Sequence, residues 1–151
     1  MFHRPLCILA FDRVGSTPEL VTRCKEILHD GVELLRRARR EGKRVVLIAD
    51  SLEQILQPLA AELGCVDDYI CNRLEFRDGR ATGRLLDPVV GGHDSGVWLE
   101  QYAQEHRLGL SSSIAYASHG PDLLMLSAVG RPCAVNPDFT LRRAAQQARW
   151  P

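Results

Sequence analysis

The chain has 151 residues, a length that suits a single domain with one hydrophobic core. Its 19 basic and 19 acidic residues balance to a formal net charge of zero, so no overall field draws it to nucleic acid or to an anionic membrane surface. The longest apolar runs have the length of strands, which excludes a membrane span.

The cysteines indicate the redox environment. They form an odd set of five without CxxC spacing, and the N-terminal residues do not read as a secretory leader. Such a set is typical of reduced thiols, so we expect a cytoplasmic protein.

Apolar runs alternate with amphipathic periodicity along the first half of the chain. The expected elements are a strand at 6–11, helices at 19–28 and 32–40, a strand at 44–48 and a helix at 52–63. We expect Asp50 or Ser51 to cap the last of these helices. Pro58 lies inside it and predicts a kink or a break.

The second half continues the alternation. We expect a strand at 67–71, a hairpin at 73–84 around Asp78-Gly79, a helix at 97–105, a strand at 113–117, a short helix at 122–129, a strand at 133–136 and a helix at 139–148. This order predicts a single α/β domain over 1–151, with a mostly parallel sheet of about five strands covered by helices on both faces. Ligands bind beyond the carboxyl ends of such strands, which directs attention to Asp12, Ala49 and Ser118.

Short motifs follow the predicted strands in a fixed order. They are Phe11–Thr17 (FDRVGST), Leu47–Ser51 (LIADS), Asp78–Leu85 (DGRATGRL), Gly92–Leu99 (GHDSGVWL), Ala115–Leu126 (AYASHGPDLLML) and Ala134–Asp138 (AVNPD). The series resembles the phosphoserine-phosphatase-like branch of the haloacid dehalogenase (HAD) superfamily, which carries DxDGT, a strand ending in Thr or Ser before Gly-Ser, DGrlTGrl, GxxKxxxL, AYGDSxxDxxML and AVNPD at these points. The resemblance implies a three-layer, Rossmann-like HAD core.

The resemblance also assigns chemistry to the first motif. An aspartate at the position of Asp12 attacks phosphorus in active relatives, and a second aspartate two residues later acts as general acid and base. Val14 stands at that second position and cannot move a proton. An alternative reading of Asp12 is a side chain that caps the following turn. The resemblance also makes Ser16 and Ser51 the candidate phosphate-binding residues.

The remaining motifs have lost further groups. Ala49 stands in place of a hydroxyl, and Ser95 in place of the lysine that holds the phosphoryl oxygens. Ser118 replaces the first of two carboxylates that hold Mg²⁺ with the nucleophile, whereas Asp122 retains the second. Asp122 also fits the N-cap of the helix after Pro121.

Loop residues leave a second metal hypothesis open. His93, Asp94 and His119 are expected around the same strand ends as Asp12 and Asp122. Imidazoles together with carboxylates suit a transition metal better than Mg²⁺. The alternative is that both histidines are exposed loop residues.

These substitutions predict a HAD-like pseudophosphatase that acts as a binding or assembly module. Only the segment between Thr17 and His29 is available for a cap, so we expect an open site without a full cap module. The alternatives are a weak Mg²⁺-dependent phosphohydrolase or phosphotransferase that uses Asp12, and an accessory domain of a lipid or acyl-transfer pathway. We expect no cofactor, with Mg²⁺ only if residual activity exists. The expected partner is another protein or a second copy, not nucleic acid, and the ligand is unknown.

Overall fold

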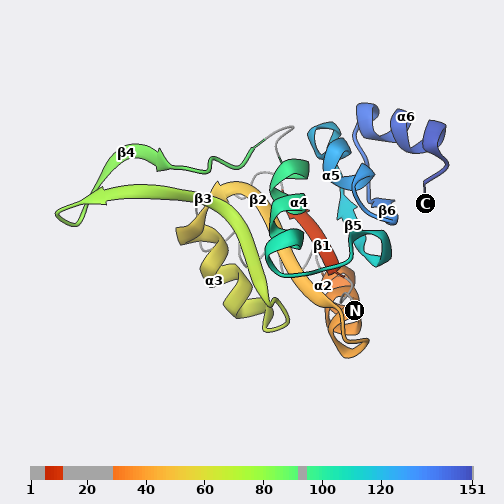
Figure 1. Cartoon of the computed structure of the whole chain (residues 1–151), viewed down its shortest axis with the longest axis horizontal. Helices are drawn as coiled ribbons and strands as arrows, with labels where there is room; N and C mark the ends of the chain where they lie inside the picture. The colour runs from red at the N-terminus through yellow and green to blue at the C-terminus, as the bar shows by residue number, and fades with distance from the viewer. Residues whose placement is uncertain (1–5, 12–28, 92–94, 151) are drawn as a thin grey trace.

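The structure, a computed structural model, describes residues 6–11, 29–91 and 95–150 (Figure 1). The helix expected at 19–28 lies outside these ranges. The strands are β1 (Leu6–Phe11), β2 (Arg44–Leu52), β3 (Asp68–Arg77), β4 (Arg80–Leu86), β5 (Ile114–Ala117) and β6 (Arg131–Ala134). The helices are α2 (His29–Arg40), α3 (Glu53–Leu63), α4 (Ser95–Glu105), α5 (Leu123–Ser127) and α6 (Phe139–Ala148), with 3-10 turns η2 (Leu110–Ser112) and η3 (Gly120–Asp122).

The strands form one sheet in the order β4-β3-β2-β1-β5-β6. All neighbouring pairs are parallel except β3 and β4, which run antiparallel. The chain moves from β1 through β2 to β3 on one side and then returns to β5 on the other. This reversal is the topological switch, and it places the expected ligand crevice beyond the carboxyl ends of β1 and β5.

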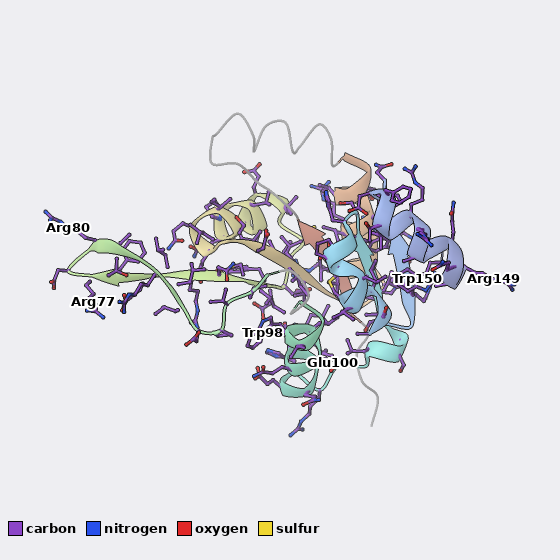
Figure 2. All side chains as sticks on the ribbon, turned by 90° about the horizontal axis from the view of Figure 1, so that it is seen from above. Arg77, Arg80, Trp98, Glu100, Arg149 and Trp150 are labelled. Atoms are coloured by element: carbon purple, nitrogen blue, oxygen red, sulfur yellow. The ribbon has the colours of Figure 1, made fainter. Side chains whose placement is uncertain are left out.

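Helices cover both faces of the sheet, and each face has its own apolar cluster. Val45, Leu47 and Ala49 of β2 pack with the buried side chains of α2 and α3. Val46 and Ile48 point the opposite way, because side chains alternate along a strand, and pack with α4, α5 and α6. Figure 2 shows α3 and α4 on opposite sides of the sheet. The three-layer α/β fold predicted from the sequence is confirmed.

The end of β2 differs from the prediction. The strand continues to Leu52, so Asp50 and Ser51 lie within it and Leu52 occupies the N-cap of α3 without a side-chain capping bond. The predicted cap is therefore wrong. Of the two outcomes predicted at Pro58, the break is wrong, because α3 runs from Glu53 to Leu63 as one helix whose apolar side packs on the sheet. The kink stays a prediction.

Other boundaries differ as well, and α2 and α4 begin earlier than expected, at His29 and Ser95. The strand and the first half of the hairpin, expected as separate pieces, form the single strand β3. The helix expected at 122–129 is shorter and is preceded by η3. The last strand lies two residues earlier than expected, at Arg131–Ala134. No helix in the described ranges is long and apolar enough to cross a membrane.

Candidate functional site

The strand register brings two of the predicted positions to the same edge of the sheet. Phe11, the last residue of β1, lies beside Ala49 of β2. On the other side Leu9 lies beside Tyr116, and Ser118 directly follows β5. Ala49 and Ser118 therefore flank the end of β1.

Several predicted site residues fall outside the described ranges. Asp12, Val14 and Ser16 follow β1 there, and His93 and Asp94 precede α4 there. The meeting of Asp12 with Ala49 and Ser118 thus stays a prediction. Ser95 is the first residue of α4, which places the position of the family lysine at the start of that helix.

Ala49 presents a buried methyl group at this edge. It is 3% exposed and packs in the cluster that α2 and α3 cover. Next to it the pairing of β2 with β3 shifts: Ile48 lies beside Ile70, whereas Leu52 lies beside Asn72. Two extra residues of β2 are accommodated in this irregularity, a feature that is common beside functional sites.

Asn72 holds the irregularity in place, a role that the sequence analysis missed. Its side-chain nitrogen donates to the Asp50 carbonyl at 2.9 Å and to the Val90 carbonyl at 2.7 Å, and its oxygen accepts from the Val90 amide at 2.7 Å. The side chain is 4% exposed. A polar residue between Ile70 and Leu74 on the core side of a strand was the available signal. Asn72 thereby ties the segment before α4 to the end of β2.

Ser118 and His119 form a polar pair after β5. The Ser118 hydroxyl and the His119 Nδ1 lie 2.7 Å apart, with the donor set by the imidazole tautomer. Both residues are partly buried. The Ser118 carbonyl accepts from the Asp138 amide at 2.8 Å. A neutral hydroxyl thus follows β5 at the position where the family pattern has a carboxylate.

Asp138 organises the loop that carries this pair, and the sequence analysis gave it no role of its own. Its carboxylate accepts from the Gly120 amide at 2.9 Å and from the Leu141 amide at 2.7 Å, which makes it the N-cap of α6. These bonds, first that from Leu141, hold the pKa of Asp138 below its usual value. An aspartate directly before an amphipathic helix was the signal for this cap.

Asp122 is 8% exposed at the N-cap position of α5, but its side chain makes no capping bond there. The expected capping role of that side chain is therefore wrong. In the part of the chain that the structure describes, no three histidine, cysteine, aspartate or glutamate side chains gather closely enough to hold a metal ion. The family pattern has two metal-binding carboxylates after β5. Ser118 supplies only a hydroxyl at the first position, whereas Asp122 still offers Mg²⁺ a charged oxygen at the second. The Mg²⁺ hypothesis depends on Asp12, and the transition-metal hypothesis depends also on His93 and Asp94. These residues lie outside the described ranges, so both hypotheses stay predictions.

The opposite end of α4 is fixed by a second polar network. The Tyr102 hydroxyl accepts from Arg44 Nε at 2.8 Å and donates to Asp68 Oδ2 at 2.9 Å. Burial, followed by the bond to Asp68, raises the pKa of Tyr102 to about 12. This network lies at the amino ends of β2 and β3, away from the strand-end site, and positions α4.

We expect Asp138→Ala to destabilise the protein by about 1–2 kcal/mol, the usual cost of losing a helix cap, because two backbone amides lose their acceptor. Asp138→Asn should retain only part of this stability, since its single oxygen accepts from one of the two amides and its side-chain nitrogen cannot accept from the other. Because the folded-state pKa of Asp138 is lowered, its stabilising contribution is present at neutral pH and is lost as pH falls through that lowered pKa. Urea unfolding at pH 7 and in acid measures both effects. Equal stability of the alanine variant and the parent at pH 7 would contradict the assignment.

The sheet order and the strand-end site define an α/β domain whose functional edge lies beyond β1 and β5. A family model described as haloacid dehalogenase-like hydrolase matches residues 12–127. The chain belongs to this family.

Curated relatives match most of this chain. The "Inhibition of morphological differentiation protein" of Streptomyces azureus is 31% identical over 125 residues, which are 83% of this chain and 45% of that protein. Phosphoserine phosphatase SerB2 of Mycobacterium tuberculosis is 30% identical over 120 residues, which are 80% of this chain and 29% of that protein. The chain thus spans less than half the length of these relatives.

Solved structures share the fold. A protein of unknown function from Bordetella pertussis Tohama I superposes with a TM-score of 0.78 and 21% identity, covering 99% of this chain and 97% of that one. A phosphoserine phosphatase with a phospho-aspartyl intermediate analogue superposes with a TM-score of 0.70 and 17% identity, covering 94% and 91%. At these identities the likeness concerns the fold.

Proposed function

We propose that this HAD-family domain is a pseudophosphatase that acts as a binding or assembly module, with little or no phosphatase turnover. The observation that carries the proposal is the pair of side chains flanking β1: a buried methyl group at Ala49 and a neutral hydroxyl at Ser118. The family pattern has a hydroxyl at the first position and a metal-binding carboxylate at the second.

The losses act on different parts of phosphoryl transfer. Ala49 has no donor for a phosphoryl oxygen, and Ser118 brings no charge to Mg²⁺. Val14 removes the general acid and base, a function that contributes roughly 10²–10⁴ in rate. Groups that act as a unit do not give additive effects, so the losses are not summed. Together they support turnover close to background.

A second candidate is a weak Mg²⁺-dependent phosphohydrolase that uses Asp12 as nucleophile. Its support is the similarity to curated proteins named phosphoserine phosphatase. The two candidates differ in a simple assay. The pseudophosphatase predicts that hydrolysis of phosphoserine and generic phosphomonoesters stays near background with Mg²⁺ and is unchanged by Asp12→Asn. Turnover that this substitution abolishes establishes the second candidate instead.

Mg²⁺ binding gives an independent prediction. A ligand at about 100 times its Kd adds about 2.7 kcal/mol to the free energy of unfolding, which raises Tm by several degrees in a domain of this size. We expect no such shift with millimolar Mg²⁺ in the parent protein. Ser118→Asp should bring partial recovery of the shift, because it restores a carboxylate after β5.

Differential scanning fluorimetry with and without Mg²⁺ measures these shifts. The matched control is Ser118→Asn, which has nearly the same size as aspartate and no charge, and should show no shift. A clear Mg²⁺ shift in the parent protein contradicts the proposal. A shift with Zn²⁺ or Mn²⁺ that His119→Ala abolishes would instead support the transition-metal hypothesis.

A further inference from the structure

The β3–β4 hairpin extends from the body of the protein as a two-stranded arm (Figure 1). Asp78 and Gly79 make its tight turn, both with positive φ, at 50° and 73°. Every residue of β4 is exposed, and Phe76 of β3 is 51% exposed. Figure 2 shows Arg77 and Arg80 near the free end of the arm, far from α4.

The arm has two chemically different faces. Its register pairs Arg77 with Arg80, Phe76 with Ala81, Leu74 with Leu85 and Arg73 with Leu86. The register shifts between Ala81 and Leu85, where β4 has two extra residues opposite β3. An even number keeps the alternation of side chains in phase, so one face is apolar and the other is mostly basic. The apolar face carries Leu74, Phe76, Ala81 and Leu85, and the basic face carries Arg73, Arg77, Arg80 and Arg84.

The positive charge of the arm is not balanced locally. Between residues 73 and 86 there are four arginines but only two acidic residues, Glu75 and Asp78. Glu75 is already engaged, since it accepts from Arg77 at 3.0 Å and from the Thr82 hydroxyl at 2.6 Å. Among the described residues, Arg80 and Arg84 have no carboxylate partner, so the outer strand of the arm carries the excess charge.

β4 also has an open backbone edge. It is the last strand in the sheet order and pairs with β3 alone among the described strands. Such an edge offers amide and carbonyl groups to a further strand. A second β4 fits poorly: β4 contains no acidic residue, so pairing like faces gathers the arginines of both copies on one face.

We propose that the outer edge of β4 binds an extended segment of a partner protein in which acidic residues alternate with apolar residues. The acidic side chains face Arg80, which precedes the register shift in β4, and Arg84, which lies at its end. The apolar side chains of the partner segment extend the apolar face that carries Phe76 and Leu85. The small side chain of Ala81 leaves room on this face for large apolar side chains of the partner. The proposal does not depend on turnover at the strand-end site.

A fluorescent synthetic peptide tests the proposal. The probe has about ten residues, enough to span a typical strand, and alternates glutamate with valine or isoleucine. We expect saturable binding by fluorescence anisotropy that weakens with added salt. A peptide of the same composition in scrambled order should bind about tenfold more weakly, a difference of about 1.4 kcal/mol, because it cannot keep acids on one face.

Charge reversal on the protein provides the second part of the test. The double variant Arg80→Glu, Arg84→Glu should bind the alternating peptide at least about tenfold more weakly, because each attractive pair becomes repulsive. The matched control is Arg143→Glu, which reverses an exposed charge on α6 and should leave binding within about twofold. Circular dichroism confirms that each variant is folded.

Other results overturn the proposal. Equal binding of the scrambled peptide, or unchanged binding by the double variant, shows that β4 does not pair with an alternating strand. Tighter binding of a single-stranded oligonucleotide than of the peptide identifies the arginines as phosphate contacts. A concentration-dependent dimer in analytical ultracentrifugation that Phe76→Asp abolishes assigns the arm to a second copy of the chain.

Discussion

Gly130→Ala is expected to lower the free energy of unfolding by about 3 kcal/mol or more, at the upper end of overpacking effects. Gly130 precedes β6, and its amide donates to the Leu110 carbonyl at 3.0 Å. A β-carbon there would overlap the Ser111 carbonyl oxygen and lie 2.7 Å from the carbonyl carbon. Both are backbone atoms, so no rotamer change relieves the overlap. The turn before β5 and the start of β6 must separate instead.

Thermal unfolding measures this effect, and a loss of about 3 kcal/mol corresponds to a Tm lower by roughly 10 °C in a domain of this size. Gly91→Ala is the matched control, because among the described residues the nearest neighbour of a β-carbon at Gly91 is the Asp50 β-carbon, at an ordinary 3.9 Å. The control should change Tm little. A Gly130→Ala protein with the parent Tm would show that η2 and the residue before β6 do not pack as closely as described.

Local sequence patterns predicted the strands and turns whose conformation depends on neighbouring residues alone. The continuous apolar run 44–48 required a strand buried on both faces, and the structure places Val45 to Ala49 in the core. Asp78-Gly79 predicted the hairpin turn, because both residues tolerate the positive φ that the turn needs. In these cases the residue types determine the conformation without help from distant contacts.

Long-range contacts explain the boundaries that the sequence did not predict. β2 continues to Leu52 because Leu52 pairs with Asn72 of β3 after the register shift. Asn72 interrupts the apolar pattern of β3, and for this reason the sequence predicted two separate pieces. The strand tolerates Asn72 because its side-chain amide bonds to the backbone of Val90, 18 residues away. A pattern within a short stretch of sequence cannot reveal a partner at this distance.

The same distinction applies to the candidate site. Motif order predicted that Ala49 and Ser118 lie near the carboxyl ends of two strands, and such ends share one edge of a parallel sheet, here on either side of β1. The role of Asn72 was missed because its partners Asp50 and Val90 lie far away in sequence. The bond from the Gly120 amide to Asp138 is equally distant, whereas the bond from Leu141 is local and had a sequence signal. The family motifs identify positions of chemistry, whereas these two residues position the backbone that carries it.

Asn72→Leu should therefore have a large effect on stability. The substitution keeps a side chain of similar size but removes the partners of the Asp50 carbonyl and of both Val90 backbone groups. A buried polar group that loses its partner costs about 1–3 kcal/mol, so we expect a total loss of about 3 kcal/mol or more. The segment before α4 would also detach from β2, which displaces Ser95 at the start of that helix.

Asn72→Asp separates the hydrogen-bond explanation from simple packing. A buried carboxylate facing the carbonyl oxygens of Asp50 and Val90 is disfavoured, so the folded-state pKa of the new side chain is raised. A raised pKa means that the folded state binds the extra proton, and the variant should gain stability relative to the parent as pH falls from 7 to 4. Urea unfolding at both pH values measures the gain, and the exposed substitution Gln147→Leu controls for added apolar surface. An Asn72→Leu protein as stable as the parent, or an Asn72→Asp protein without the pH trend, would contradict the role of Asn72 in holding Val90 against β2.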